Sequence, residues 1–435
     1  MLESPKTAPL NAGQQAAADG FFAFLFDQTQ EIIISGAGGV GKTFLMGYLI
    51  DEIMPRYFST CQLMDIEPEF DEVVMAATTN KAAEVLTLST SRGCGTIHSF
   101  MNLKVRDDYG TGRSILTKKN TWTVHQNKIV FIDECSMIDS ALLAMLKEGT
   151  HKCKIVYVGD HSQLAPVMEA ISPIYRNNIP MFVLTEPMRN AGQPALLEVC
   201  QQLRDTVETG VFNPIKIVPG VIDHMTSEEM QAEIDKHFVS GETQSRILGY
   251  TNKRVQDYNQ YIREVRGLPE QFTVGEHLIN NSGIQFKNGM LSVEQEVKIT
   301  FMSSQTASIR IEEGVEMDVH ICTLETMLGE RYEDVKIPAN REHYEALVAY
   351  YRRMKNWERF YFLKNNFPDL RPRDACTVHK SQGSSYDTTF IDLNDLSTCR
   401  NPDLAARLLY VAFTRARNRV VLYGELAEKF GGLIQ

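Results

Sequence analysis

The segment Gly36–Thr43, with the sequence GAGGVGKT, has the residue types and spacing of a phosphate-binding loop. It lies between Glu31–Ser35, expected to form a buried parallel strand, and a helix expected over Lys42–Met54. Glycines let backbone N–H groups face a phosphate, and the helix start adds its positive dipole end. The strand–loop–helix context disfavours the alternative, a glycine-rich turn without a ligand. We expect Lys42 on the β and γ phosphates, the Thr43 hydroxyl on Mg²⁺, and a nucleotide bound by Gly36, Gly38, Gly39, Val40, Gly41, Lys42 and Thr43.

Two acidic residues follow the strand expected over Ile129–Asp133. Asp133 can hold Mg²⁺, and Glu134 can orient and deprotonate a water molecule that attacks the γ-phosphate. The alternative is a pair of acids that cap a helix. Beside a phosphate loop, the pair favours nucleotide hydrolysis. Glu134 also disfavours a kinase, because a transferase gains nothing from activating water.

A glutamine follows the strand expected over Ile155–Gly159, within the segment Gly159–Leu164. Gln163 can sense the γ-phosphate or its attacking water, or it can belong to an ordinary polar turn. Its local sequence favours neither interpretation.

The chain alternates between strand and helix patterns as βαβ units do, in two blocks that meet near residue 184. A Tyr-Gly-Thr-Gly turn within residues 99–122 predicts a hairpin insertion in the first block. Short strand-like pieces over 273–330 and one helix over 339–366 interrupt the second. The predicted fold is two α/β domains, each with an insertion. Further elements are expected at Val73–Ala77, from Asn80, and at Arg246–Thr251, Asn252–Glu264, Thr388–Leu393 and Arg419–Tyr423.

The composition sets outer limits on function. The 435 residues allow about three domains. No apolar run approaches the length that spans a bilayer, so we expect no membrane association. The eight cysteines form no C-x-x-C pair, which indicates a reducing cytoplasm. The net charge of −11 argues against a nucleic-acid partner, because such proteins usually present a basic face.

Nine segments nevertheless resemble, in family order, the Q motif and motifs I, Ia, Ib, II, III, IV, V and VI of the superfamily 1B helicases, the group of the Pif and RecD helicases. Thr78 stands where the family usually has proline in motif Ia. The segments are Leu10–Ala17, Gly36–Thr43, Ala77–Ala83, Gly95–Ser99, Asp133–Met137, Gly159–Leu164, Leu184–Arg189, Thr377–Ser384 and Leu409–Arg417.

This resemblance implies an α/β fold with two RecA-like parallel-sheet domains. The first would comprise residues 1–98 and 123–183, and the second residues 184–272 and 375–435. Residues 99–122 would form a small β-hairpin, the pin that separates strands. Residues 273–374 would form a β-barrel with a helical tower.

The resemblance also implies roles for single residues. Gln14 would read the adenine, Gly383 would join the nucleotide site, and Arg189 and Arg415 would neutralise charge on the γ-phosphate of ATP. The alternative for either arginine is a surface ion pair. Contacts to DNA are expected from Thr79, Lys81, Thr96, His98, Thr377, His379 and Lys380. The alternative for His98 and His379 is a role in packing.

Tyr109 is the candidate wedge of the pin, and an ordinary turn residue is an equal alternative. In the expected tower, Trp357, Phe360, Tyr361 and Phe362 alternate with basic residues. Such side chains can stack on bases, but the pattern more often forms a helix core with a solvated face.

The function implied is an ATP-dependent DNA helicase that uses Mg²⁺ and moves 5′→3′ on single-stranded DNA. Forked duplex DNA would be its substrate, and a single-stranded-DNA-binding protein or replisome proteins its partners. The family further implies that the protein acts as a monomer in the cytoplasm, which would be that of a host bacterium if a phage encodes it. It also implies a role in replication or recombination. The alternatives are a DNA-stimulated translocase without strand separation, a P-loop nucleotide kinase, and a non-enzymatic DNA-binding platform.

The acidic total is a sum over unlike segments. Residues 312–334 hold eight acids and one arginine, whereas residues 400–419 hold five arginines and one acid. Residues 63–72 add five acids and no base, and the presumed pin segment 99–122 has five bases and two acids. Strongly basic surfaces would add nonspecific, salt-dependent grip on DNA. We expect the acidic segments to confine DNA to a narrow basic track.

Overall fold

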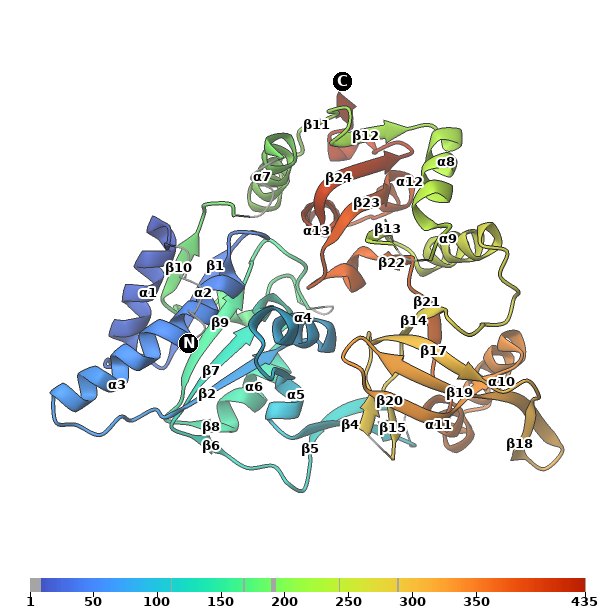
Figure 1. Ribbon diagram of the computed structural model, residues 1–435, viewed down its shortest axis with the longest axis horizontal. Coiled ribbons are helices and arrows are strands. Elements are labelled where there is room, and N and C mark those ends of the chain that lie inside the picture. The colour runs from blue at the N-terminus through green and yellow to red at the C-terminus, as the bar shows by residue number, and fades with distance from the viewer. Residues whose placement is uncertain are drawn as a thin grey trace, which may run out of the picture. The chain divides into compact units, whose positions relative to one another are not determined.

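A computed structural model describes residues 9–110, 112–166, 169–188, 193–241, 243–287 and 289–434 (Figure 1), the side chains of residues 113 and 114 excepted. The chain divides into two compact units. Unit 1 contains residues up to 103, 118–224 and from 381 onward, and unit 2 contains residues 104–117 and 225–380. The second α/β domain expected from the sequence is thus divided between the two units.

Unit 1 is built on a parallel six-stranded sheet. Parallel strands bring their carboxyl ends to one edge, where ligands of α/β sheets bind. The phosphate loop and the segments after Asp133 and Gly159 all leave the sheet at this edge. The strands, in spatial order, are β10 (Met181–Leu184), β1 (Glu31–Gly36), β9 (Lys154–Gly159), β7 (Lys128–Asp133), β2 (Glu72–Ala77) and β3 (Gly95–Thr96).

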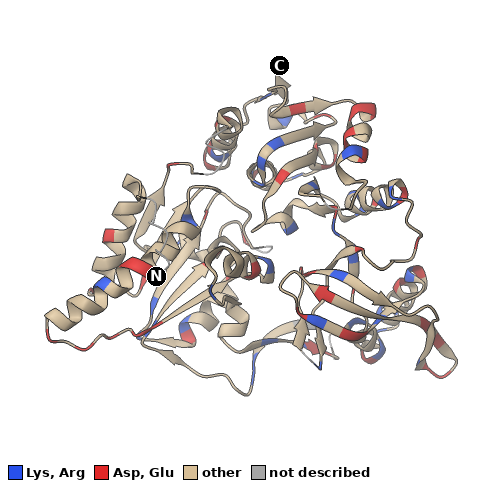
Figure 2. Ribbon diagram, viewed as in Figure 1, with Lys and Arg blue, Asp and Glu red and all other residues tan. Residues whose placement is uncertain are grey.

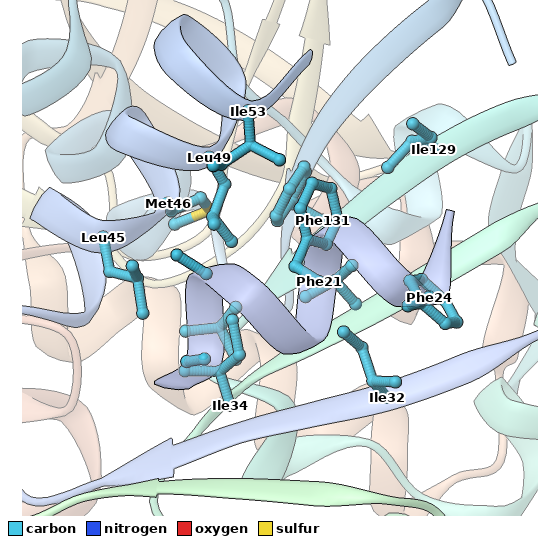
Figure 3. Close-up of a cluster of buried hydrophobic side chains, with 14 of the residues drawn as sticks. Phe21, Phe24, Ile32, Ile34, Leu45, Met46, Leu49, Ile53, Ile129 and Phe131 are labelled. Atoms are coloured by element: carbon cyan, nitrogen blue, oxygen red, sulfur yellow. The ribbon is translucent and has the colours of Figure 1, made fainter. Parts of the chain in front are cut away.

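A hydrophobic core joins this sheet to the helices beside it (Figure 3). Phe21 and Phe24 of α1 are buried, and the rings of Phe21 and Phe131 lie 5.6 Å apart between centroids. Because these side chains are apolar, their burial stabilises the sheet that carries the loop. The helices are α1 (Ala12–Phe24), α2 (Lys42–Tyr48), α3 (Met54–Leu63), α4 (Asn80–Thr90), α5 (Ile97–Phe100) and α6 (Ser140–Glu148).

The helix expected to end at Met54 is longer than predicted. A π-helical turn over Leu49–Ile53 connects α2 to α3, which continues to Leu63. Pro55 lacks an N–H group and its ring would clash with a preceding carbonyl in a regular helix. The wider π-helical turn just before Pro55 accommodates the proline, so the chain stays helical.

Unit 1 also contains the strands β23 (Tyr386–Asp392) and β24 (Ala416–Tyr423), which pair in parallel. The helix α13 (Pro402–Thr414) is mostly buried, and it packs against α7 (Pro194–Thr209). The remaining elements of this part are α12 (Leu393–Ser397), β11 (Ile215–Lys216), β12 (Ile222–Met225), β25 (Leu433–Ile434), β6 (His125–Gln126) and β8 (Thr150–His151).

Unit 2 combines a parallel strand pair with an antiparallel six-stranded sheet. The pair is β13 (Ser245–Gly249) and β22 (Ala375–Thr377), accompanied by α8 (Ser227–Phe238) and α9 (Asn252–Val265). The antiparallel sheet consists of β14 (His277–Asn280), β17 (Glu296–Met302), β18 (Ala307–Glu312), β19 (Val315–Thr326), β20 (Arg331–Pro338) and β21 (Leu370–Pro372). The short hairpins are β15 (Ile284–Phe286) with β16 (Gly289–Leu291), and β4 (Leu103–Asp108) with β5 (Arg113–Lys118).

The single helix expected over 339–366 is wrong, because the segment forms two helices. These are α10 (Arg341–Arg353) and α11 (Trp357–Asn366). Lys355 has a φ of 54°, a left-handed conformation that ends the first helix. The Asn356 side chain then accepts a hydrogen bond from the Arg359 backbone N–H and begins the second.

Within the described ranges, no helix has the length and apolar character needed to cross a membrane.

Candidate nucleotide-hydrolysis site

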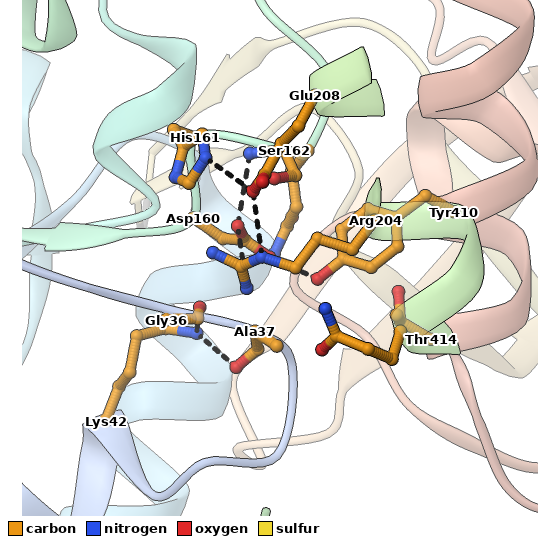
Figure 4. A network of polar contacts seen from close by, with 12 residues as sticks. Gly36, Ala37, Lys42, Asp160, His161, Ser162, Arg204, Glu208, Tyr410 and Thr414 are labelled. Carbon is orange, nitrogen blue, oxygen red and sulfur yellow. Dashed lines mark hydrogen bonds and ion pairs between the residues drawn. The ribbon is translucent and has the colours of Figure 1, made fainter. Parts of the chain in front are cut away.

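The phosphate loop wraps around the start of α2. Gly41 precedes the helix with a φ of 82°, a conformation that glycine adopts without strain. Gly36 has no room for a side chain, since a Cβ there would lie 2.7 Å from the Leu184 carbonyl oxygen. The Lys42 Nζ donates hydrogen bonds to the carbonyl oxygens of Gly36, at 2.7 Å, and Ala37, at 3.0 Å (Figure 4). The lysine charge therefore lies directly over the loop.

Gln14 is buried against this loop. Its side chain forms a capping box with Asn11 at the start of α1, and its Nε2 donates to the Val40 carbonyl oxygen at 3.3 Å. The same Nε2 lies 3.0 Å from the Met188 sulfur. Met188 also donates its backbone N–H to the Gly39 carbonyl oxygen at 2.8 Å. The structure thus brings the Q-motif glutamine and the residue before Arg189 to the phosphate loop, while Arg189 itself lies outside the described residues.

The acidic pair stands at the carboxyl end of β7. Glu134 has a φ of 52°, a strained conformation of the kind found at functional sites. Thr78 secures it, because its hydroxyl donates to the Glu134 carbonyl oxygen at 3.1 Å and its N–H to the Asp133 carbonyl oxygen at 3.3 Å. The sequence did not reveal this role for Thr78, whose partner is 56 residues away.

The pair suits a divalent cation. Loss of hydration, with the charge of Glu134, raises the pKa of the Asp133 carboxyl to about 7, although the Lys42 ammonium opposes the shift. The Glu134 Oε2 is buried and has no hydrogen-bond partner among the described residues. Crowded negative charge and an unsatisfied oxygen are what a hard cation with oxygen ligands would relieve. The half-buried Thr43, at the start of α2, is the other candidate ligand.

Gln163 is held by its backbone while part of its side chain is left unsatisfied. Its N–H donates to the Asp160 carbonyl oxygen at 3.2 Å, and its own carbonyl oxygen accepts from Arg407 Nη1 at 2.6 Å. The side chain is 2% exposed, and its Oε1 has no hydrogen-bond partner in the described part of the chain. Gln163 therefore combines a fixed backbone with a side-chain oxygen that could accept a hydrogen bond from a bound group.

Arg415 lies beside the phosphate loop and is buried. Its guanidinium donates to the carbonyl oxygens of Ser384, at 3.2 Å, and Val411, at 3.3 Å, and to the Thr414 hydroxyl at 3.2 Å. A Cβ placed on Gly38 would lie 3.9 Å from Arg415 Nη2. A surface ion pair does not describe this arginine. Gly383 instead packs on α4, where its Cβ would lie 3.4 Å from that of Ala82.

The residues expected to contact DNA fall into two groups. In unit 1, the hydroxyls of Thr79 and Thr96 cap α4 and α5, Lys81 pairs with Glu84 at 3.2 Å, and burial lowers the pKa of His98. In unit 2, the Thr377 hydroxyl accepts from the Lys380 N–H at 3.4 Å, and the Lys380 ammonium bonds Asn281. The ring of His379 is tilted by 33° to that of Tyr250, with 6.4 Å between the centroids. Burial lowers the pKa of His379 as well. Since Thr79 and Thr96 cap helices, each of these two threonines already has a structural role.

Tyr109 stands at the tip of the β4–β5 hairpin in unit 2. It is 55% exposed, and its ring meets Tyr361 of α11 edge-on at 5.2 Å. Asn365 donates to Asp107 at 3.0 Å, and a Cβ on Gly112 would collide with Trp357. The helix α11 thus supports the hairpin. Tyr361 is buried, and Phe360 and Phe362 pack against a local core that contains Leu363 and Phe367, as the helix-core interpretation of this segment predicts.

Comparisons with known proteins find helicases among the relatives of this chain. Residues 9–213 match the family model described as an AAA domain, and residues 374–423 match the UvrD-like helicase C-terminal domain. The chain is 25% identical to the ATP-dependent DNA helicase Dda of Enterobacteria phage T4, over 94% of this chain and 98% of that protein. The chain is a superfamily 1B helicase. It is also 22% identical to the RecBCD subunit RecD of Haemophilus influenzae, over 90% of this chain and 66% of RecD.

Solved structures agree on the fold of this helicase. The Pif1 helicase from Bacteroides, in complex with ADP-AlF3 and single-stranded DNA, aligns with a TM-score of 0.54 at 14% identity, covering 98% of this chain and 95% of that one. Pif1 from Candida albicans aligns with a TM-score of 0.51 at 15% identity, covering 98% and 97%. The prediction of an α/β fold with two RecA-like domains is confirmed.

Proposed function

We propose that this ATP-dependent DNA helicase moves 5′→3′ along single-stranded DNA and separates strands at a fork with its β4–β5 hairpin. One observation carries the proposal. The phosphate loop, the acidic pair and the segment of Gln163 leave the six-stranded sheet at one edge, and Arg415, from a segment about 380 residues from the loop, lies beside Gly38 in the same unit. The likeness to a helicase over nearly the whole chain supplies the substrate, DNA.

The site residues divide the work of hydrolysis. Lys42 and Arg415 would neutralise charge on the transferred phosphoryl group, since each brings a cation to the loop. Glu134 would take the proton of the attacking water, and Gln163 would orient that water. Thr43 and Asp133 would hold Mg²⁺, which would supply positive charge to polarise the phosphates. Gln14 would read the adenine from its buried position against Val40.

The DNA contacts stay a proposal. We propose that Thr79, Lys81, Thr96 and His98 in unit 1, and Thr377, His379 and Lys380 in unit 2, contact the strand through backbone and side-chain groups without reading bases. Exposed carboxylates follow α3 at residues 65–72 (Figure 2), and a second acidic segment lies in β18–β20. Both would repel phosphates and so confine DNA elsewhere. We propose action as a monomer, with a single-stranded-DNA-binding protein or replisome proteins as partners.

The direct test is ATP hydrolysis with and without single-stranded DNA. We expect strong stimulation by the strand, because a motor couples turnover to its track. A protein that hydrolyses ATP at one rate in both conditions would contradict the proposal. Phosphoryl transfer to a small acceptor would indicate a kinase instead.

Tyr109→Ala is expected to lower the rate of fork unwinding about ten-fold and to change single-strand-stimulated ATP hydrolysis less than two-fold, because stacking of an aromatic ring on a base is worth roughly 1–3 kcal/mol. The measurement compares the two rates on one preparation. Tyr350→Ala is the matched control, an exposed tyrosine on α10 that should leave both rates unchanged. If Tyr109→Ala leaves unwinding unchanged, Tyr109 is an ordinary turn residue.

A further inference from the structure

A buried carboxylate with no assigned role lies next to the Gln163 loop. Asp160 is fully buried, one residue after β9. Its Oδ2 accepts a hydrogen bond from the Tyr410 hydroxyl at 2.6 Å, and its Oδ1 accepts from the Ser162 N–H at 3.1 Å. Arg204 Nη1 lies 3.6 Å from Oδ1 (Figure 4). A buried charge is tolerated only with such partners, so the group is a built feature of the fold.

Arg204 lies between two carboxylates, those of Asp160 and Glu208. Burial opposes the charge on Arg204, but the neighbouring Asp160, with Tyr410 and Glu208, raises the pKa of the guanidinium above its ordinary value. Glu208 also accepts from Arg204 Nε at 3.4 Å and contacts His161 at 3.1 Å. Helix α7 is therefore linked to Asp160 through Arg204 and to His161 through Glu208.

The partners of the loop come from two helices that pack together in unit 1. Arg204 belongs to α7, whereas Tyr410 belongs to α13. Arg407, one turn before Tyr410, donates to the carbonyl oxygens of His161 and Gln163, each at 2.6 Å. Arg415 directly follows the same helix. The backbone of the loop is thus fixed by the helix that also presents Arg415.

The contacts of the loop with α7 and α13 hold the backbone of Gln163 in place. Its backbone is bonded on both sides, and its Oε1 is left without a hydrogen-bond partner in the described residues. A polar group that is held in place before its ligand arrives stabilises a transition state without reorganisation. A small displacement of the loop that carries Gln163 would therefore misplace its Oε1.

We propose that Arg204 and Tyr410 are positioning residues that brace Asp160, and through it set Gln163 in register with Arg415. The inference rests on the proposed role of Gln163 and Arg415 in ATP hydrolysis. Arg204 lies outside all nine helicase motifs of the sequence. These residues should affect turnover and not nucleotide binding, because no contact of Arg204, Tyr410 or Asp160 within the described part of the chain reaches the phosphate loop.

Tyr410→Phe removes only the hydroxyl that Asp160 accepts. We expect the kcat of ATP hydrolysis to fall about ten-fold, because small misplacements of reacting groups are costly. The KM for ATP and the Kd for single-stranded DNA should change less than two-fold. The matched control is Tyr157→Phe, which also removes a hydroxyl donated to a carboxylate, that of Glu31 at 2.8 Å, from a buried tyrosine. Glu31 begins β1 at the end opposite the phosphate loop, so kcat should not change.

A second set of variants separates positioning from folding. Arg204→Gln leaves Asp160 without its buried countercharge, so both Tm and kcat should fall. Asp160→Asn/Arg204→Gln removes both members of the buried ion pair together, so Tm should recover in part while kcat stays low. Recovery of both quantities, or an unchanged kcat in Tyr410→Phe, would overturn the proposal. Basal hydrolysis is measured beside the DNA-stimulated rate, so that a lack of stimulation in the unaltered protein counts against the proposed function and the variants still test the brace.

Discussion

Glu134→Gln is expected to lower the kcat of DNA-stimulated ATP hydrolysis about 1,000-fold, because a positioned general base contributes roughly 10²–10⁴-fold. Glutamine keeps the shape of the side chain but cannot take a proton from water. The strained backbone at Glu134 should tolerate the exchange, because the hydrogen bonds from Thr78 go to backbone carbonyl oxygens and not to the carboxylate. ATP binding should persist, and single-turnover and equilibrium binding measurements distinguish the two effects.

The control for this variant is Glu52→Gln, an exposed carboxylate in the π-helical turn of the same unit. It should hydrolyse ATP at the parental rate. If Glu134→Gln retains more than about a tenth of the parental kcat, Glu134 is not the base that the site requires.

Arg415→Ala is expected to lower kcat about 1,000-fold, the scale on which an arginine that reaches the γ-phosphate contributes. Arg415→Lys should recover little of this loss, since lysine keeps the charge but lacks the planar fork that binds two oxygens. Because Arg415 is 5% exposed and donates three hydrogen bonds, Tm is measured for both variants. A drop in kcat at a temperature well below Tm then reports on chemistry.

Arg417→Ala provides the matched control for Arg415. Arg417 lies two residues further on and forms an exposed ion pair with Asp387 at 3.1 Å. Exposed pairs contribute about 0–1 kcal/mol, so both stability and kcat should change little. Equal losses of kcat at positions 415 and 417 would contradict a specific role for Arg415.

The local part of the site could be predicted from the sequence because covalent spacing determines it. A strand, a glycine loop and a helix in direct succession leave one arrangement for Lys42 and Thr43. The same holds for Asp133 and Glu134, which follow a buried strand. The sheet edge that gathers these segments follows from parallel strands.

The long-range part could not be predicted in this way. Asp160 and Tyr410 are 250 residues apart, and nothing in either segment indicates that Asp160 accepts a hydrogen bond from the Tyr410 hydroxyl. Arg204 is one of several charged residues in α7, and only packing of α7 against α13 selects it. The same limit hid the bond between Thr78 and Glu134.

Helix boundaries were missed for a different reason. The break between α10 and α11 depends on a left-handed lysine, Lys355, a conformation that the residue type does not announce. The continuation of α2 into α3 depends on a π-helical turn before Pro55. The capping roles of Thr79 and Thr96, in contrast, follow a readable rule, since threonine favours the position before a helix.

Unwinding of matched duplexes that carry a single-stranded tail on only the 5′ or only the 3′ side tests helicase activity and polarity most directly. With ATP and Mg²⁺, we expect the 5′-tailed substrate to be unwound and the 3′-tailed substrate to stay paired. Lys42→Ala, which lacks the charge over the phosphate loop, should unwind neither. Unwinding of the 3′-tailed substrate alone, or unwinding by Lys42→Ala at the parental rate, would contradict this account.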